Sequence, residues 1–111
     1  METTLPDDLR ASVRAYVAKL AARFAGRVRL VRVFGSWARG EAREDSDLDV
    51  AVVIEGLTHA EWNDAVGDAV EVELDGGASI SPYVVSGEHF DRLVQRERKI
   101  AADILREGVA A

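Results

Sequence analysis

Two segments rich in β-branched residues, separated by a short polar stretch, constrain the fold of this chain most strongly. Val28 to Phe34 runs into Gly35-Ser36, a pattern that predicts a strand ending at a tight turn. Asp47 to Ile54 predicts a second strand. Because side chains alternate along a strand, Asp47 and Asp49 are expected on one face, with Cα atoms roughly 7 Å apart. One short loop therefore separates a Gly-Ser turn from two carboxylates.

Helices are expected before and after this pair of strands. Apolar residues three or four positions apart predict an amphipathic helix between Pro6 and Gly26. Its basic residues fall away from the apolar stripe and indicate a solvated face, or a docking face for an acidic partner; they are Arg10, Arg14, Lys19, Arg23 and Arg27.

A second helix is predicted from the capping-box sequence at residues 58–61. Apolar residues follow it at four-residue spacing; they are Trp62, Val66, Val70 and Leu74. Of these, Trp62 is interpreted as a core-facing residue. The helix is expected to reach Gly76-Gly77, although residues 70–74 also alternate as an extended segment would.

The remainder of the chain predicts one more strand and one more helix. Ala78 to Val85 is expected to be extended, and Pro82 favours a sheet edge or an irregularity in the ladder. Ser86 is a suitable N-cap for a C-terminal helix that breaks near residues 96–98 and ends at Gly108. The pattern as a whole indicates an α/β (α+β) fold with a small mixed sheet flanked by helices.

Composition limits the classes of function. A chain of 111 residues fits a single domain, residues 1–111, and 48% hydrophobic with 31% charged residues is typical of a soluble globular protein. With no cysteine and no export signal or membrane-spanning run, we expect a cytoplasmic protein without disulfides. The net charge of -6 makes bulk nucleic-acid binding an unfavourable hypothesis.

The loop between the first two strands combines residue types suited to a metal-bound triphosphate. Mg²⁺ prefers hard oxygen ligands, and it commonly takes one or two protein carboxylates, here Asp47 and Asp49. Two such ions, about 3.5–4 Å apart, can activate an attacking oxygen and neutralise leaving pyrophosphate. At Gly35-Ser36 the backbone N–H groups and the hydroxyl can approach a phosphate, and Arg39 offers a planar guanidinium to the same group.

In this segment the chain resembles the minimal nucleotidyltransferases of the DNA polymerase beta-like superfamily. The match is specific from Phe34 to Val53, where Phe-Gly-Ser-x-Ala-Arg-Gly is followed by Ser-Asp-x-Asp-Val, and looser over nearly the whole chain. The resemblance implies that Gly35 and Ser36 bind a nucleoside triphosphate and that Asp47 and Asp49 bind magnesium. It implies transfer of a nucleoside monophosphate to an acceptor. Small members are often encoded beside a HEPN-domain toxin, and some act as antitoxins by adenylylating that toxin.

The chain departs from this family at one position that bears on catalysis. The family usually carries a third carboxylate on the next strand, where it binds metal and deprotonates the acceptor, and the alignment places Ser81 there. Serine is a poor magnesium ligand and no general base near neutral pH. Glu73 and Asp75 lie upstream as candidate substitutes. The sequence thus supports two hypotheses, a magnesium-dependent transferase and a degenerate binding module that neutralises a partner without chemistry.

Trp37, within the same loop, has two interpretations. Its ring suits stacking on a nucleobase or a partner surface, and it equally suits packing that orders the loop itself.

Overall fold

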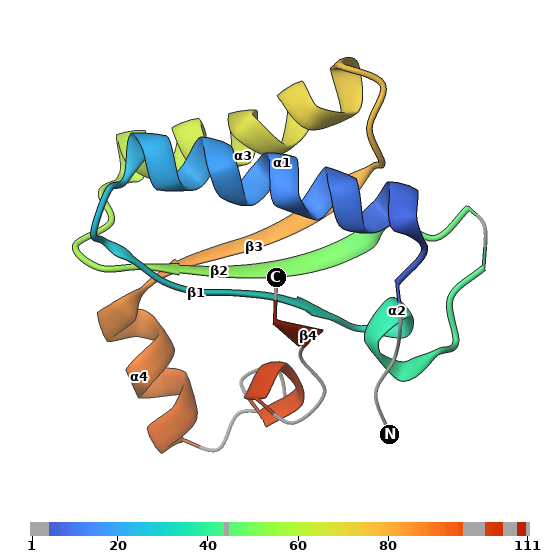
Figure 1. Ribbon diagram of the computed structural model, residues 1–111. Helices are drawn as coiled ribbons and strands as arrows, with labels where there is room; N and C mark the ends of the chain where they lie inside the picture. Colours follow the sequence, from blue (N-terminus) through green and yellow to red (C-terminus); the bar gives the residue numbers. More distant parts are fainter. Residues whose placement is uncertain (1–4, 44, 97–101, 106–108, 111) are drawn as a thin grey trace.

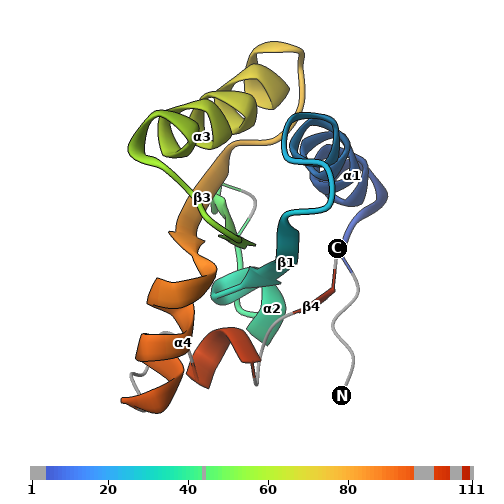
Figure 2. The ribbon, with the colours of Figure 1, turned by 90° about the vertical axis from the view of Figure 1, so that its left-hand side faces the viewer.

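The protein forms a small mixed sheet with helices on both faces (Figures 1 and 2). The computed structural model describes residues 5–43, 45–96, 102–105 and 109–110. The helices are α1 (Asp7–Arg23), α2 (Ser36–Arg39), α3 (His59–Leu74) and α4 (Gly87–Gln95), and the strands are β1 (Val28–Phe34), β2 (Leu48–Ile54), β3 (Ile80–Ser86) and β4 (Val109–Ala110). Helices α1 and α3 cover one face, whereas α4 and a helical turn at 102–105 lie on the other (Figure 1). The predicted α/β class is confirmed.

The strand order β3-β2-β1-β4 places β2 between two partners. Strand β1 runs antiparallel to β2 and β4, whereas β2 and β3 are parallel. Pro82 lies on the edge strand β3, as predicted, where its missing N–H removes no bond from an inner ladder. The short pairing of β4 with β1 was not expected from the sequence.

The side chains of β2 divide the core into two parts. Toward α1 and α3, one set is fully buried; it consists of Leu48, Val50, Val52 and Ile54. Toward α4, Ala51 and Val53 are buried with Phe90 and Ile104. This alternation agrees with the prediction for β2, except that the regular strand begins at Leu48 and Asp47 precedes it.

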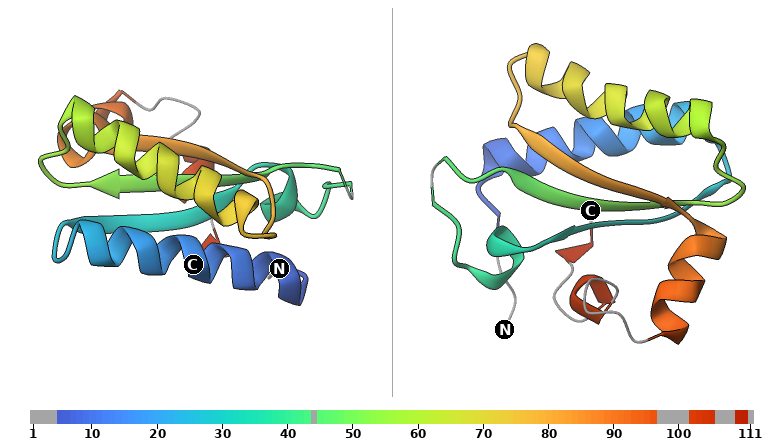
Figure 3. Two further views of the ribbon diagram at one scale, coloured as in Figure 1. Left: turned by 90° about the horizontal axis from the view of Figure 1, so that it is seen from above. Right: turned by 180° about the vertical axis from the view of Figure 1, so that it is seen from behind.

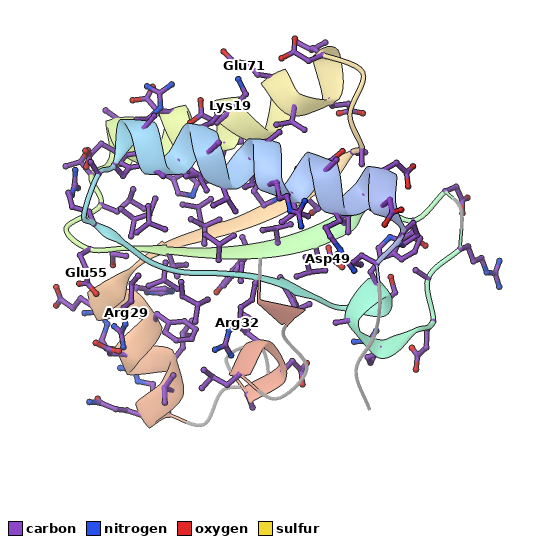
Figure 4. The ribbon with its side chains drawn as sticks, viewed as in Figure 1. Lys19, Arg29, Arg32, Asp49, Glu55 and Glu71 are labelled. Atoms are coloured by element: carbon purple, nitrogen blue, oxygen red, sulfur yellow. The ribbon has the colours of Figure 1, made fainter. Side chains whose placement is uncertain are left out.

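Helices α1 and α3 are joined by a buried hydrogen bond and a row of ion pairs. The Tyr16 hydroxyl donates to the Ala65 carbonyl oxygen at 2.9 Å, and Arg23 donates to both carboxylate oxygens of buried Asp68 at 2.9 and 3.0 Å. Further along the helices, Lys19 bonds Glu71 at 3.0 Å (Figure 4), and Arg27, just after α1, bonds Glu61. Three of the five basic residues assigned to a solvated or docking face therefore bind α3 instead.

Helix α3 reaches Leu74, so the extended alternative for residues 70–74 was wrong. The capping box is present, since Thr58 accepts from the Glu61 N–H and Glu61 accepts from the Thr58 N–H. The prediction that Trp62 faces the core was wrong, since this side chain is 39% exposed. The buried residues of α3 are Ala65, Asp68, Ala69 and Val72, whereas Val66 is half-buried against the core and Val70 and Leu74 are 49% and 78% exposed.

Helical geometry explains why the apolar series of α3 does not form one buried face. At 3.6 residues per turn, a strict four-residue spacing advances about 40° beyond a full turn at each step. The series therefore winds around the helix, from Val66, half-buried against the core, through Val70 to the largely exposed Leu74.

The C-terminal prediction is confirmed in part. Ser86 caps α4 by accepting from the His89 N–H, and α4 ends at Gln95, just before the expected break. Residues 97 and 98 of that break, and the expected end at Gly108, lie outside the described residues. Across the described segments, no helix is long and apolar enough to cross a membrane.

Candidate active site

Gly35 forms the turn between β1 and the short helix α2. Its φ of 75° is in the region that favours glycine, and a Cβ built there would overlap Asp49 Oδ2. It would also lie 3.2 Å from Asp49 Cγ. Glycine at this position therefore lets the Asp49 carboxylate lie directly against the backbone of the turn, a contact between two strands that the sequence analysis did not anticipate.

Asp49 lies on the α4 side of the sheet, beside α2 (Figure 4). It is paired in register with Phe34 on β1 and with Ser81 on β3. Nearby, the rings of Phe34 and Tyr83 pack edge to face, with their centroids 6.5 Å apart. Burial raises the pKa of the Asp49 carboxyl, the negative charge of Asp47 raises it further, and Arg39 partly opposes both effects.

Asp47 is exposed and lies in the segment that leads into β2. It borders a cavity of about 360 Å³ between the start of α1, the 45–47 segment and residues 76–79. Its influence on the pKa of Asp49 shows that the two carboxylates interact electrostatically. The structure thus brings together the predicted acids, which repel each other in the absence of a cation.

The two other predicted phosphate-binding residues lie in α2. Ser36 begins the helix and is half-buried, and its carbonyl oxygen accepts from the Glu41 N–H. Arg39 ends the helix with an exposed side chain, and its Nε donates to Glu41 at 3.1 Å. All of the predicted site residues, Gly35, Ser36, Arg39, Asp47 and Asp49, therefore lie at the α2 end of the β1–β2 pair.

Trp37 orders the loop that joins α2 to β2. Its indole Nε1 donates to the Ser46 carbonyl oxygen at 3.1 Å, and the Ser46 hydroxyl accepts from the Arg43 N–H at 2.9 Å. The ring also packs against the core on the α1 side. These contacts favour the loop-ordering interpretation of Trp37 over stacking on a ligand.

Ser81 occupies the strand position next to Asp49, and its side chain is exposed. No three acidic or histidine side chains among the described residues gather closely enough to hold a metal ion. Glu73 and Asp75 therefore do not complete a three-carboxylate cluster with Asp47 and Asp49. In the described structure the candidate site has two acids and a serine hydroxyl beside the second one.

Comparison with known proteins assigns the family. A model of the nucleotidyltransferase domain matches residues 13–102, which include β1, β2, the loop between them and β3. This chain belongs to the nucleotidyltransferase domain family. A solved structure provisionally described as a minimal nucleotidyltransferase is similar at 33% identity, with a TM-score of 0.62, over 100% of this chain and 97% of that one.

Two archaeal relatives of this nucleotidyltransferase-family chain carry more specific names. A Methanocaldococcus jannaschii protein, provisionally named a protein adenylyltransferase, is 26% identical over 75% of this chain and 79% of its own length. The protein adenylyltransferase MntA of Thermococcus cleftensis is 43% identical over 46% of this chain and half of its own length. The fold is also shared with a chain from a toxin–antitoxin crystal structure with AMP-PNP, at 18% identity and a TM-score of 0.50. The match covers 86% of this chain and 68% of the chain from the toxin–antitoxin structure.

Proposed function

We propose that this protein transfers AMP from magnesium-bound ATP to a side chain of a partner protein. The observation that carries the proposal is the contact of Asp49 with the Gly35 turn, beside Asp47, in a chain that belongs to the nucleotidyltransferase family. The named relatives support AMP as the transferred group and a protein as the acceptor.

The donor set at the site fits a magnesium ion. Asp47 and Asp49 offer hard carboxylate oxygens, and their mutual repulsion is the kind of energetic cost that a bound cation relieves. When bound there, magnesium would neutralise charge on the triphosphate and on the departing pyrophosphate. The two-metal arrangement stays a prediction for this chain.

Residues of this chain would bind and orient the nucleotide. Gly35 lets the Asp49 carboxylate lie against the backbone of the turn, in the space that a side chain would otherwise fill. The Arg39 guanidinium, now bonded to Glu41, would exchange this partner for phosphate oxygens, which its planar fork of N–H donors can bind in pairs. Ser36 would add its hydroxyl as a donor.

We infer that the partner is a toxin, with a HEPN-domain protein as the candidate that the family resemblance supplies. In this scheme the acceptor hydroxyl oxygen bonds the α-phosphorus of ATP, the bond to the β-phosphate breaks and pyrophosphate leaves, and the hydroxyl proton passes to solvent rather than to a third carboxylate, because Ser81 stands beside Asp49. We therefore expect slow transfer that speeds up if the acceptor or the partner contributes a base.

Incubation with labelled ATP, magnesium and candidate toxins tests this proposal. Label should appear on the acceptor with the wild-type protein and disappear in the double variant Asp47→Ala/Asp49→Ala. Asp45→Ala removes an exposed acid from the same loop and serves as the matched control. Transfer that survives the double substitution would refute the assigned site.

The alternative function is partner neutralisation by a degenerate, non-catalytic domain. Ser81 favours it, because this residue offers neither a strong magnesium ligand nor a base. The variant Ser81→Asp distinguishes the two functions. Gain of transfer in that variant, with no transfer by the wild-type chain and unchanged partner binding, would establish the binding function. Transfer by the wild-type chain would exclude it.

A further inference from the structure

A groove lies between the first half of α1 and the segment that follows α3. Two cavities form it, of about 350 and 360 Å³, and both are bordered by Asp8, Ser12, Gly76 and Gly77. Seen from above, the segment after α3 comes down beside the first half of α1 (Figure 3, left). The larger cavity extends to Asp47 of the candidate active site, whereas the smaller one extends away from it to Lys19. We call the two cavities together the α1–α3 groove.

Contacts within the chain hold the walls of this groove in place. Ser12 is buried on α1; its hydroxyl accepts from the Ala78 N–H at 2.9 Å and donates to the Asp8 carbonyl oxygen at 3.1 Å. A Cβ on Gly77 would lie 2.7 Å from the Val72 carbonyl oxygen, so glycine lets this segment pack closely on α3. The groove is therefore formed before any ligand binds, as most ligand sites are.

Small apolar groups border the cavity that lies away from Asp47. Ala11 and Ala15 contribute methyl groups from α1, and Val72 contributes its side chain from α3. A surface of this kind can cover the aliphatic stem of a long side chain whose charged end reaches the rim.

The rim of the groove is negative. Four aspartates border the two cavities; they are Asp8, Asp45, Asp47 and Asp75. In the segments that the structure describes, none of these four forms an ion pair with a basic side chain. Lys19 borders the groove as well, but its ammonium group is already bonded to Glu71 at 3.0 Å. Carboxylates without basic partners, gathered around a cavity, create a potential that attracts cations.

We propose that the α1–α3 groove binds a segment of the acceptor protein that carries lysine or arginine near the modified hydroxyl. This inference rests on the AMP transfer proposed above. The occupant follows from charge complementarity, because an acidic segment would be repelled by the rim and a purely apolar one would leave its carboxylates without partners.

Lysine and arginine match both parts of the groove. Their stems would pack on Ala11, Ala15 and Val72, and their charged ends would reach the rim. Because Asp47 is assigned to magnesium, we assign the basic side chain to Asp8 and Asp75, which lie farther along the groove.

The position of the groove suits the presentation of an acceptor. It ends at Asp47, two residues before Asp49, at the same end of the sheet as Gly35. An extended chain advances roughly 3.3 Å per residue, so a few residues separate a side chain bound in the groove from a hydroxyl at the two carboxylates. The groove would thus select which hydroxyl groups of a partner are modified.

Fluorescence anisotropy with labelled synthetic peptides, in the absence of ATP, tests the proposal. The peptides contain the same serine, threonine and tyrosine and differ only in their flanking residues, which are lysine, glutamine or glutamate. The wild-type protein should bind the lysine peptide most tightly, and added salt should weaken this binding. The double variant Asp8→Asn/Asp75→Asn should lower the affinity for the lysine peptide about fivefold, as expected for two partly exposed ion pairs.

A second double variant, Asp7→Asn/Glu73→Gln, is the matched control. It also removes two negative charges from the first turn of α1 and the last part of α3, but these exposed residues border neither cavity. Its affinity for the lysine peptide should stay near that of the wild type. Circular dichroism checks that both variants are folded. Equal losses in the two double variants, or equal affinities for the lysine and glutamine peptides, would overturn the proposal.

Transfer of label from ATP to the same peptides separates this inference from the proposed function. Faster transfer to the lysine peptide, reduced in Asp8→Asn/Asp75→Asn but not in the control variant, would support both. Equal transfer to the lysine and glutamine peptides would overturn the role of the groove and leave AMP transfer standing. Binding of the lysine peptide in the groove without any transfer would support the groove as a binding site and contradict the transfer function.

Discussion

The two faces of strand β2 differ in what their side chains do. On the α1/α3 face, four consecutive alternate positions are buried aliphatic residues that form the main core. On the other face, the series begins with Asp49, two residues after Asp47 in the segment that leads into the strand, and becomes apolar only at Ala51 and Val53. One strand can thus be rigidly held by one face while the end of its other face stays free for polar chemistry. Stability and activity should therefore respond to different residues of the same strand.

Asp49→Asn should have the largest effect, and only on activity. Loss of the carboxylate should lower AMP transfer by about 10³-fold, the equivalent of several kcal/mol of charge stabilisation. The free energy of unfolding should be unchanged or higher, since the folded environment already raises the pKa of this carboxyl and disfavours its charge. Transfer assays and urea unfolding measure the two effects. An Asp49→Asn variant that is destabilised but transfers AMP normally would contradict the assignment of activity, rather than stability, to this face of β2.

Val52→Ala tests the other face of the same strand. Val52 is fully buried, and its truncation should cost about 2–3 kcal/mol of unfolding free energy through lost burial and a cavity. At temperatures where the variant is folded, its transfer rate should stay near that of the wild type. Ser81→Ala, at an exposed position on the opposite face, is the control and should change stability by less than about 0.5 kcal/mol. Equal losses in both variants would show that the faces do not differ.

Gly35→Ala should affect both properties moderately. The Gly35 conformation (φ 75°, ψ -148°) is one that essentially only glycine adopts, so alanine there should cost about 1–3 kcal/mol of stability, and the new Cβ should push the Asp49 carboxylate from its position. Transfer should therefore fall more than stability alone explains. Gly40→Ala is the control for positive φ alone, because Gly40 has a φ of 74° in the left-handed helical region (ψ 20°) and a Cβ built there meets no atom within 4 Å. Identical behaviour of the two variants would remove the role assigned to the Gly35–Asp49 contact.

The smallest effect concerns the ion pair at the start of α3. Hydrogen bonds from Arg27 first, and from Thr58 second, lower the pKa of Glu61 from 4.5 to about 2. A lowered folded pKa means that the charged pair stabilises the protein above pH 4.5 and that this contribution is lost as the pH falls toward 2. Glu61→Gln keeps an acceptor for the capping box. Its stability deficit, measured by urea unfolding, should shrink between pH 5 and pH 2; a constant deficit would exclude the charge as its cause.

Much of this fold followed from local patterns in the sequence. Strands, helices and the edge position of Pro82 were predicted because β-branched runs, a capping box and proline act within a few residues. The exposure of Trp62 was not predicted, because only the tertiary packing of α3 selects its smaller side chains for the core. The two-residue strand β4 was too short to give a sequence signal.

The candidate site was predictable in its residues but not in its main contact. The order of Gly35, Ser36, Asp47 and Asp49 along the chain, with a strand on each side, indicated a shared end of the sheet. The close packing of Asp49 on Gly35 depends on strand register, which the sequence does not specify. Likewise, the pairing of Lys19, Arg23 and Arg27 with α3 depends on how the two helices lie together.

Calorimetric titration of the purified protein with a non-hydrolysable ATP analogue, with and without magnesium, tests the central claim most directly. The account predicts binding that requires magnesium and is lost in Asp47→Asn and Asp49→Asn but kept in Asp45→Asn. Binding of equal strength without magnesium, or in the Asp49→Asn variant, would contradict it.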